Sequence, residues 1–409
     1  MNQVLDFSML LPLGSYFLVA ALIVRTAPRA LRNPAFAFCN ASALLYFFDW
    51  GTWSGGLALY CAWTLGHYFF VRFMYRHRLL YLAAMLFPLL VLVWSKVGAG
   101  WTQEFLVQAG ANREDLATWS MVGLSFMAFR LSILPVELRA RNLPPPDPAT
   151  YLSFAFFLPT LLVGPISAYP RFVQSMDDSH GHWPEAIPAL CQLLVGAVKY
   201  LVLATVCDQL SFSGYFWDHN QHGLPELLVS GVGFYLYVYF SFSGFCEFCI
   251  GAARLIGIEI DDNFRNPLAS RNLQVFWGTW HITLGRYVGS MVFTPLTKWL
   301  VRRWGTDHLH AATVSSILLS FLVIGVWHGQ SWNFLLFGAM HGLGVIVVYS
   351  WSLLLKRWLG LSGYRRYLNN RSIALCAWLL TFLYISLSVI LFANEPAQLE
   401  LLWRQFRGV

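Results

Sequence analysis

Charged residues are scarce in this chain. Only 11% of its 409 residues are Asp, Glu, Lys or Arg, whereas 57% are hydrophobic and 17% are aromatic. Soluble domains carry about 25% charged residues, so the scarcity excludes an ordinary soluble domain. The apolar residues form repeated stretches of about 17–25 residues, which is the length of a membrane-crossing helix. The composition therefore predicts an all-α polytopic membrane protein.

Other absences narrow the class further. Met1–Val24 contain no Lys or Arg and so lack the basic start of a secretory signal; we expect residues 8–25 to be a retained first helix with its N-terminus outside. The seven cysteines are odd in number and mostly lie in apolar stretches, which favours packing, also for the pair Cys246 and Cys249. No internal repeat is evident, and we expect one domain over residues 1–409.

Ten stretches are candidate spans: residues 8–25, 35–49, 55–71, 79–97, 118–137, 188–207, 226–250, 311–327, 331–355 and 373–393. The connections rich in Lys or Arg are expected on the cytoplasmic side: Arg25–Arg32, Arg72–Arg78, Arg139–Arg141, Arg254–Arg271, Arg302–Arg303 and Lys356–Arg371. Because the basic residues flank apolar spans, the net charge of +7 indicates membrane lipids as neighbours and does not indicate nucleic acid.

Two stretches do not fit this alternation. Residues 150–170 are interrupted by Pro159 and by Gly164-Pro165, and residues 272–300 are apolar and aromatic but bounded by arginines. We expect both to be re-entrant, entering and leaving on the cytoplasmic side. Broken backbone at membrane depth is tolerated only where protein or water covers it, so two such elements predict a vestibule inside the protein.

Two histidines are the leading candidates for chemistry. His328 lies in Gly325-Val326-Trp327-His328-Gly329, at the end of an apolar run, and His281 follows Trp280 in the second broken stretch. An ionisable side chain at membrane depth is costly and usually has a task. Two histidines facing one cavity could divide proton transfer and substrate orientation. The alternative is that each bonds a carbonyl within the bundle.

Other polar residues are weaker candidates for substrate binding: His341, Ser241, Ser243, Asn263, Arg265 and Arg271, together with the tryptophans Trp277, Trp280 and Trp327. His341 and the two serines have a structural alternative, since such side chains often bond helix backbone. The two arginines either face an anionic donor or are ordinary cytoplasmic charge. The remaining histidines are expected to be structural or in loops, and no set of metal ligands is complete, so no metal is predicted.

An ordered series of motifs resembles the membrane-bound O-acyltransferase family, within it the bacterial branch of alginate O-acetylases and teichoic-acid D-alanyl transferases. The motifs are Leu162-Val163-Gly164-Pro165-Ile166, Tyr239 to Phe245, Asn263-Phe264-Arg265-Asn266-Pro267 with Ser270-Arg271, Phe276-Trp277 to Leu284, Val326 to Gly329, and Phe337 to Gly342. They cover residues 150–345, the motif-bearing core.

The resemblance implies a curved bundle of about eleven transmembrane helices around a central tunnel, in the bacterial inner membrane. It implies transfer of an acetyl or D-alanyl group from a cytoplasmic thioester, either acetyl-coenzyme A or a phosphopantetheine carrier protein, to a hydroxyl of an extracytoplasmic polysaccharide or other polymer. His328 would be the general base, and His281 would orient a substrate or stabilise charge. No tightly bound cofactor is implied.

A partner outside the membrane is expected, because the sequence offers no large extracytoplasmic domain to grip a polymer. Two other functions stay open. One is O-acylation of a lipid or a small hydroxyl compound. The other is a transporter or flippase, although transporters often contain repeats and this chain shows none.

Overall fold

The computed structural model of the protein describes residues 10–47, 54–98, 123–161, 163–179, 181, 186–217 and 223–407. Within these ranges the chain is helical and contains no β-strand. A single isolated bridge joins Phe264 to Trp280. The prediction of an all-α protein is therefore confirmed.

Six helical stretches among the described residues are long and apolar enough to span a membrane: Arg78–Lys96, Ala186–Phe216, Leu224–Ile256, Thr306–His328, Trp332–Asn369 and Arg371–Ala393. Each coincides with a predicted span. Together they make the chain a multi-pass membrane protein. The first predicted span forms α1 (Leu10–Thr26), a shorter apolar helix.

The other three predicted spans are also helical but do not join this set. They form α2 (Arg29–Phe47), α3 (Ser54–Phe73) and α7 (Leu124–Ala140). Helix α2 begins with Arg29 and Arg32 and carries Pro34 in its second turn, so part of it is less apolar than expected. Residues 8–9, 48–49 and 118–122 of the predicted spans lie outside the described residues.

The chain divides into two compact units, and each is described by itself. The first comprises residues 1–195 and 245–261, and the second residues 196–244 and 262–409. The first unit holds α1, α2, α3, α4 (Arg78–Val93), η3 (Trp94–Gly98), α7, α8 (Pro148–Ala155), η4 (Leu158–Thr160), α9 (Tyr169–Asp178) and nearly all of α10 (Ala186–Ala197). The single domain expected over 1–409 stays a prediction.

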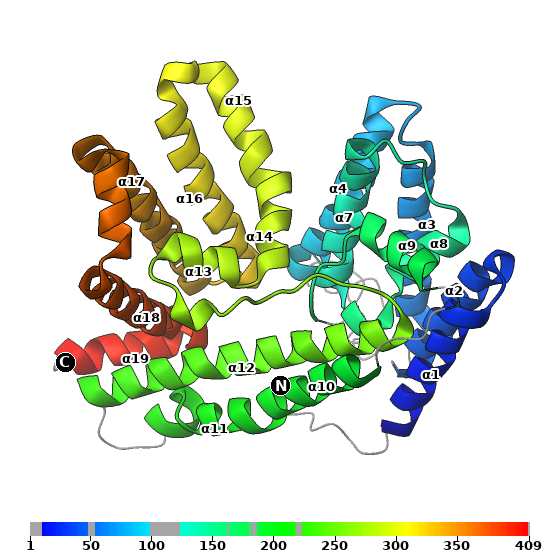
Figure 1. Ribbon diagram of the computed structural model, residues 1–409, viewed down its shortest axis with the longest axis horizontal. Helices are drawn as coiled ribbons and strands as arrows, with labels where there is room; N and C mark the ends of the chain where they lie inside the picture. Colours follow the sequence, from blue (N-terminus) through cyan, green and yellow to red (C-terminus); the bar gives the residue numbers. More distant parts are fainter. Residues whose placement is uncertain are drawn as a thin grey trace, which may run out of the picture. The chain divides into compact units, whose positions relative to one another are not determined.

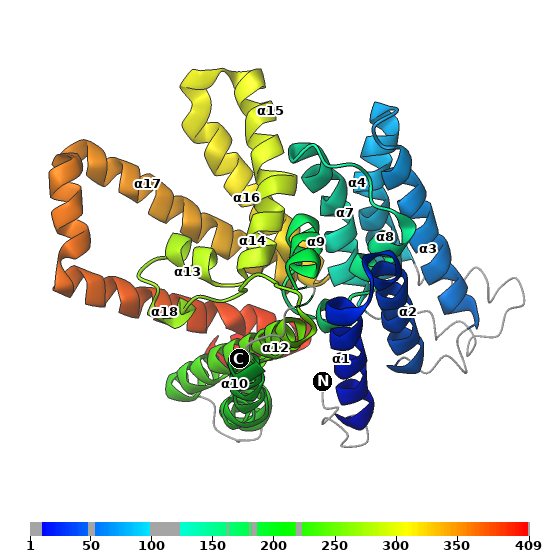
Figure 2. The same ribbon diagram turned by 45° about the vertical axis from the view of Figure 1, so that its right-hand side comes forward.

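The second unit holds η5 (Val198–Leu203), α11 (Ala204–Gln209), η6 (Phe212–Phe216), most of α12 (Leu224–Ile256), η7 (Pro267–Ala269), α13 (Leu273–Thr279), α14 (Ile282–Val288), η8 (Gly289–Phe293), α15 (Thr294–Trp304), η9 (Thr306–His308), α16 (Leu309–His328), α17 (Trp332–Asn369), α18 (Arg371–Ala393) and α19 (Pro396–Arg407). In Figures 1 and 2, α15 and α16 form a helical hairpin (yellow), and α17 leads through a sharp turn into α18 (orange to red).

The break predicted in residues 150–170 is present in the first unit. Helix α8 ends at Ala155, and the chain passes through η4 to Gly164, whose φ of 129° suits glycine. Arg130, only 1% exposed, donates hydrogen bonds to the carbonyl oxygens of Phe154 (2.8 Å) and Thr160. A side chain from α7 thus satisfies backbone groups that the break leaves without helical partners.

The second broken stretch differs from its prediction. The chain breaks between α13 and α14, at Trp280 and His281, but then continues as one helical run from Ile282 to Trp304. A short re-entrant element was expected. Pro295, in the first turn of α15, has no N–H for the preceding turn. The π-helical turn η8 comes directly before α15 and lets the helix continue across this position.

Helices α16 and α17 approach closely because glycines meet at their crossing. A Cβ atom on Gly338 would lie 2.5 Å from the carbonyl oxygen of Phe321, and one on Gly325 would lie 2.4 Å from that of Phe334. Small residues at such crossings are typical of membrane helices. The crossing places His328, the last residue of α16, close to the first turns of α17.

Candidate functional site

The two leading histidines line one cavity. A pocket of about 170 Å³ in the second unit is lined by Tyr235, Val238, Phe242, Phe276, Trp277, Trp280, His281, Leu284, His328, Phe337, His341, Ile385, Val389 and Phe392. Its walls come from α12, α13, α14, α16, α17 and α18. All other lining side chains are apolar or aromatic, so the histidines are the main polar groups that a bound molecule would meet.

The backbone at His281 is strained. Its φ is 45°, in the left-handed region that non-glycine residues seldom adopt, at a cost of about 1–3 kcal/mol. Two backbone hydrogen bonds hold the break: Ile282 N donates to the carbonyl oxygen of Asn263, and Arg265 N donates to that of Thr279, both over 2.9 Å. The stretch around Asn263 therefore fixes the direction in which His281 points.

The proton position on His281 follows from its neighbours. The side-chain oxygen of Asn263 lies 3.1 Å from the backbone N of Thr283, 2.9 Å from the Thr283 hydroxyl and 3.0 Å from Nδ1 of His281. A backbone N–H can only donate, so this atom of Asn263 is the acceptor oxygen. Nδ1 of His281 therefore carries the proton, and Nε2 keeps its lone pair.

His281 is also neutral. Its side chain is buried, and burial together with the neighbouring charge of His328 lowers its pKa to about 3. At neutral pH the ring therefore has no N–H to offer beyond the one bound by Asn263. Nε2 makes no hydrogen bond within the described chain and can accept one from a hydroxyl in the cavity. The expected alternative of stabilising negative charge does not fit this tautomer.

His328 lies across the cavity on a different helix. It ends α16, and Gly329 after it is extended, with φ of −172°. Its ring packs against Trp327 (4.5 Å between centroids) and meets the ring of Phe392 edge to face (4.9 Å). Unlike His281 it is partly exposed. Aromatic packing thus holds the ring while leaving it accessible.

His341 is held by hydrogen bonds at both nitrogens. The indole N–H of Trp277 donates to Nδ1 over 3.3 Å, and Nε2 lies 3.0 Å from the hydroxyl of Ser388, which itself donates to the carbonyl oxygen of Ile385. Because an indole can only donate, the His341 proton is on Nε2. His341 lines the cavity, but its arrangement matches the structural alternative and fixes Trp277 in the wall.

The structure divides the other candidate residues. Trp277 and Trp280 line the cavity, and Trp280 stacks on Phe276 at 5.4 Å. Asn263 does not line it but holds His281 from behind, and Trp327 packs on His328 outside the lining. These placements extend the site beyond the residues that face it.

The remaining candidates lie elsewhere. Ser241 donates to the carbonyl oxygen of Val238 in its own helix, and Ser243 is buried, so neither serine reaches the cavity. Arg265 is exposed, and Arg271 lines a different cavity. The sequence missed the contribution of α18, namely Ile385, Ser388, Val389 and Phe392; serine inside an apolar stretch was the available signal.

No group of three or more His, Cys, Asp or Glu side chains within the described ranges is arranged to hold a metal ion. The chemistry of the cavity therefore has to be sought in the histidines themselves. Their pairing across an aromatic pocket, in the order of motifs set out above, can be compared with known proteins.

The model of the membrane-bound O-acyltransferase family matches residues 56–390 of this chain. The chain belongs to the membrane-bound O-acyltransferase family. The match includes every residue that lines the histidine cavity except Phe392. The resemblance inferred from the motifs is therefore confirmed.

Among its relatives is a teichoic acid D-alanyltransferase of Streptococcus thermophilus, 28% identical over 57% of this chain and 57% of that protein. A peptidoglycan O-acetyltransferase of Helicobacter pylori is 25% identical over 59% of this chain and 43% of that protein. A probable alginate O-acetylase of Pseudomonas aeruginosa is 23% identical over 70% and 51%. The chain thus spans about half the length of these relatives.

Proposed function

We propose that this protein is an O-acyltransferase of the bacterial inner membrane that moves an acetyl or D-alanyl group from a cytoplasmic thioester to a hydroxyl of an extracytoplasmic polymer. The observation that supports it best is the single cavity shared by His281 and His328 in a chain of this family. The relatives are named for acyl transfer to teichoic acid, peptidoglycan and alginate.

In the proposed reaction, the hydroxyl oxygen of the acceptor attacks the thioester carbonyl carbon. His328 takes the hydroxyl proton as the carbon–oxygen bond forms. The carbon–sulfur bond then breaks, and the proton passes from His328 to the leaving sulfur, which departs as a thiol. General-base assistance of this kind contributes about 10² to 10⁴ in rate.

His281 has a different part in this scheme. Its neutral ring presents the lone pair of Nε2, so it accepts a hydrogen bond and orients the attacking hydroxyl. Because Nδ1–H is bound to Asn263, we do not assign His281 to the developing negative charge. Trp277 and Trp280 form the apolar wall that limits water access to the thioester.

The donor and its route are part of the proposal. We expect acetyl-coenzyme A or a phosphopantetheine carrier protein on the cytoplasmic side, a tunnel through a bundle of about eleven transmembrane helices, and a separate extracytoplasmic protein that binds the polymer. O-acylation of a lipid or small hydroxyl compound is the second candidate. Membership of an acyltransferase family counts against the transporter alternative.

The test combines chemistry with a folding control. The purified protein in detergent should release thiol from acetyl-coenzyme A or a D-alanyl carrier protein and transfer the acyl group to a polymer fragment. His328→Ala should lower transfer by about 10² to 10⁴. His308→Ala is the matched control, because His308 is exposed and outside the cavity.

Near-normal transfer by a monodisperse His328→Ala protein would remove His328 from the mechanism. The acceptor is identified separately, by mass spectrometry and NMR of surface polymer from cells with and without the gene. Loss of O-acetyl or D-alanyl esters from one polymer is the expected result. An unchanged polymer together with a changed lipid would favour the second candidate.

A further inference from the structure

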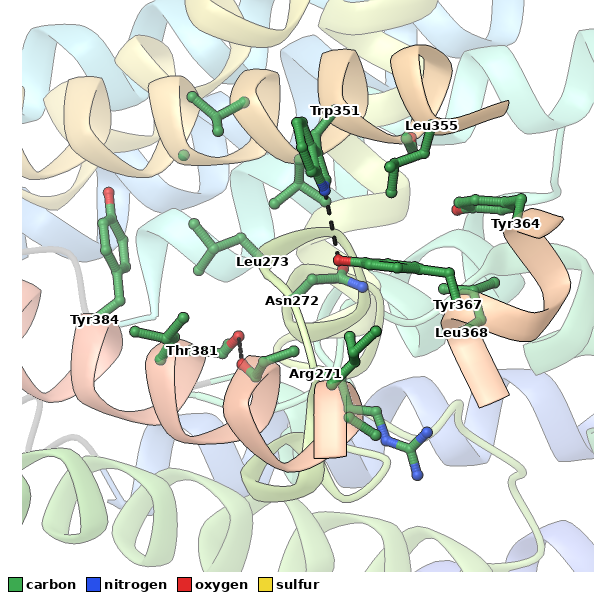
Figure 3. A pocket seen from close by; sticks show the side chains of 18 residues that line it. Arg271, Asn272, Leu273, Trp351, Leu355, Tyr364, Tyr367, Leu368, Thr381 and Tyr384 are labelled. Carbon is green, nitrogen blue, oxygen red and sulfur yellow. Dashed lines mark hydrogen bonds between the residues drawn. The ribbon is translucent and has the colours of Figure 1, made fainter. Parts of the chain in front are cut away.

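A second and larger cavity lies between α17 and α18. Its volume is about 480 Å³, within the range of about 300–1,000 Å³ that small-molecule sites occupy. It is lined by Arg271, Asn272, Leu273, Gly344, Val347, Val348, Trp351, Ser352, Leu355, Tyr364, Tyr367, Leu368, Ile373, Ala374, Ala377, Leu380, Thr381 and Tyr384. Figure 3 shows these side chains from close by. None of the lining residues is acidic, and most are apolar.

A bend in α17 creates the space. Gly360 interrupts the helix with φ of 65°, so residues 361–369 form a short leg that joins the long part of α17 to α18. Figure 2 shows the chain run out along α17, turn through this leg and return along α18. Both helices are candidate membrane spans. The cavity therefore lies between two helices surrounded by lipid.

The polar groups in this cavity are already used by the protein. Ser352 donates to the carbonyl oxygen of Tyr349 (2.8 Å), Thr381 to that of Ala377 (2.7 Å) and Tyr384 to that of Met340 (2.7 Å). The indole N–H of Trp351 points to the hydroxyl of Tyr367. A ligand with buried amide groups would find few partners here, at a cost of about 1–3 kcal/mol for each unpaired group.

Positive charge marks one end of the cavity. Arg271 is its only charged lining residue, is exposed, and makes no hydrogen bond or ion pair within the described chain. Lys356 lies 5.2 Å from the ring of the lining residue Tyr364. Leu273 and Tyr384 stand away from Arg271 and Tyr364 in Figure 3. The apolar interior thus has a cationic, tyrosine-bearing opening.

We propose that this cavity binds an acyl chain of an anionic membrane phospholipid, with the headgroup beside Arg271. A hydrocarbon chain needs no hydrogen-bond partners and suits the saturated polar groups of the lining. A phosphopantetheine arm also carries a phosphate, but its amides would stay unpaired. Basic side chains at the membrane surface attract anionic lipid, at about 1 kcal/mol each. This inference does not depend on the proposed acyl transfer.

The test is native mass spectrometry of the purified full chain, with added dioleoyl phosphatidylglycerol or dioleoyl phosphatidylcholine. We expect one phosphatidylglycerol to be retained in preference to phosphatidylcholine. Arg271→Gln should weaken that preference by about fivefold. Ala377→Trp should remove the bound lipid, because the indole fills the space between α17 and α18, and Ala374→Phe one turn earlier is a second variant of the same kind.

Matched controls keep the two effects apart. Arg302→Gln removes an exposed arginine of α15, and Leu379→Trp adds an indole at an exposed position of α18; neither residue lines the cavity. Both should bind lipid as the unaltered chain does. Equal retention by a folded Ala377→Trp or Ala374→Phe protein would assign the lipid to the outer surface and overturn the site. Displacement of phosphatidylglycerol by coenzyme A would assign the cavity to the donor instead.

Discussion

At the scale of single residues, Asn263 controls the chemistry of His281 without facing the cavity. Its side-chain oxygen accepts from Nδ1 of His281 and from the backbone and hydroxyl of Thr283. Asn263 is itself 1% exposed. Loss of this oxygen frees His281 to take either tautomer and leaves the buried donors of Thr283 without their acceptor.

Asn263→Ala should therefore lower the turnover number by about 10- to 100-fold, as for other hydrogen-bond partners that fix a histidine tautomer. The KM for the donor should change much less, because Asn263 does not line the cavity. Steady-state kinetics on protein of verified monodispersity measures the two effects separately. A rise in KM at unchanged turnover would show instead that Asn263 binds substrate, as the sequence suggested.

Asn263→Asp is the conservative comparison. A carboxylate still accepts from Nδ1 of His281, so much of the lost turnover should return at neutral pH. The added negative charge favours the imidazolium and raises the pKa of His281 above its value of about 3. Activity of this variant should consequently fall at a higher pH than that of the unaltered chain as the solution is acidified. An identical acid limb in the two pH–rate profiles would contradict the pairing.

The role of Asn263 could not be read from its sequence motif. The motif placed Asn263 before the broken stretch and favoured direct contact with a donor. Its real position depends on the pairing of residues 263–265 with residues 279–282, which only the folded chain brings together. His281 and His328 were easier to find, because a histidine in an apolar stretch stands out whatever the tertiary contacts are.

At the scale of elements, the crossing of α16 and α17 sets the position of His328. A methyl group on Gly338 would overlap the carbonyl oxygen of Phe321, at 2.5 Å, and crowd the Cα of Gly325, at 3.2 Å. Both are backbone atoms and cannot rotate away. Relief requires the helices to separate, which also displaces Phe337 and His341 from the cavity wall.

Gly338→Ala should accordingly destabilise the protein by about 1–3 kcal/mol and reduce acyl transfer. Gly289→Ala is the control, because a Cβ there meets no atom within 4 Å. Replacing a helical glycine where there is space removes unfolded-state entropy, so the control should be unchanged or slightly more stable. Thermal unfolding in detergent separates the two variants. Equal midpoints would mean that the helices do not cross at Gly338.

The helices themselves were largely predictable, whereas their interruptions were only partly so. Long apolar stretches gave α16 and α18 nearly to their ends, because hydrocarbon around the chain forces every backbone group into helical pairing. Proline and glycine located the break after α8. The helical run from Ile282 to Trp304 was missed, because a π-helical turn next to Pro295 leaves no simple mark in the sequence.

At the scale of the whole molecule, the basic connections orient the spanning helices of the second unit. The α15–α16 connection follows Arg302 and Arg303, and the α17–α18 connection lies within Lys356–Arg371. If both are cytoplasmic, as their charge predicts, the α16–α17 connection at Gln330 is on the opposite side. His328 then lies near the extracytoplasmic end of α16, where a polymer hydroxyl would reach it.

This orientation can be measured with single cysteines introduced after the native ones are replaced by alanine or serine. Thr306→Cys and Ser362→Cys mark the two basic connections, and Gln330→Cys and Glu395→Cys mark the opposite side; all four positions are exposed. In intact cells an impermeant maleimide should label positions 330 and 395 strongly. Positions 306 and 362 should react only after the membrane is opened, because the positive-inside rule keeps them in the cytoplasm. Labelling of position 306 in intact cells, with protection of position 330, would place His328 beside the donor and reverse the proposed direction of transfer.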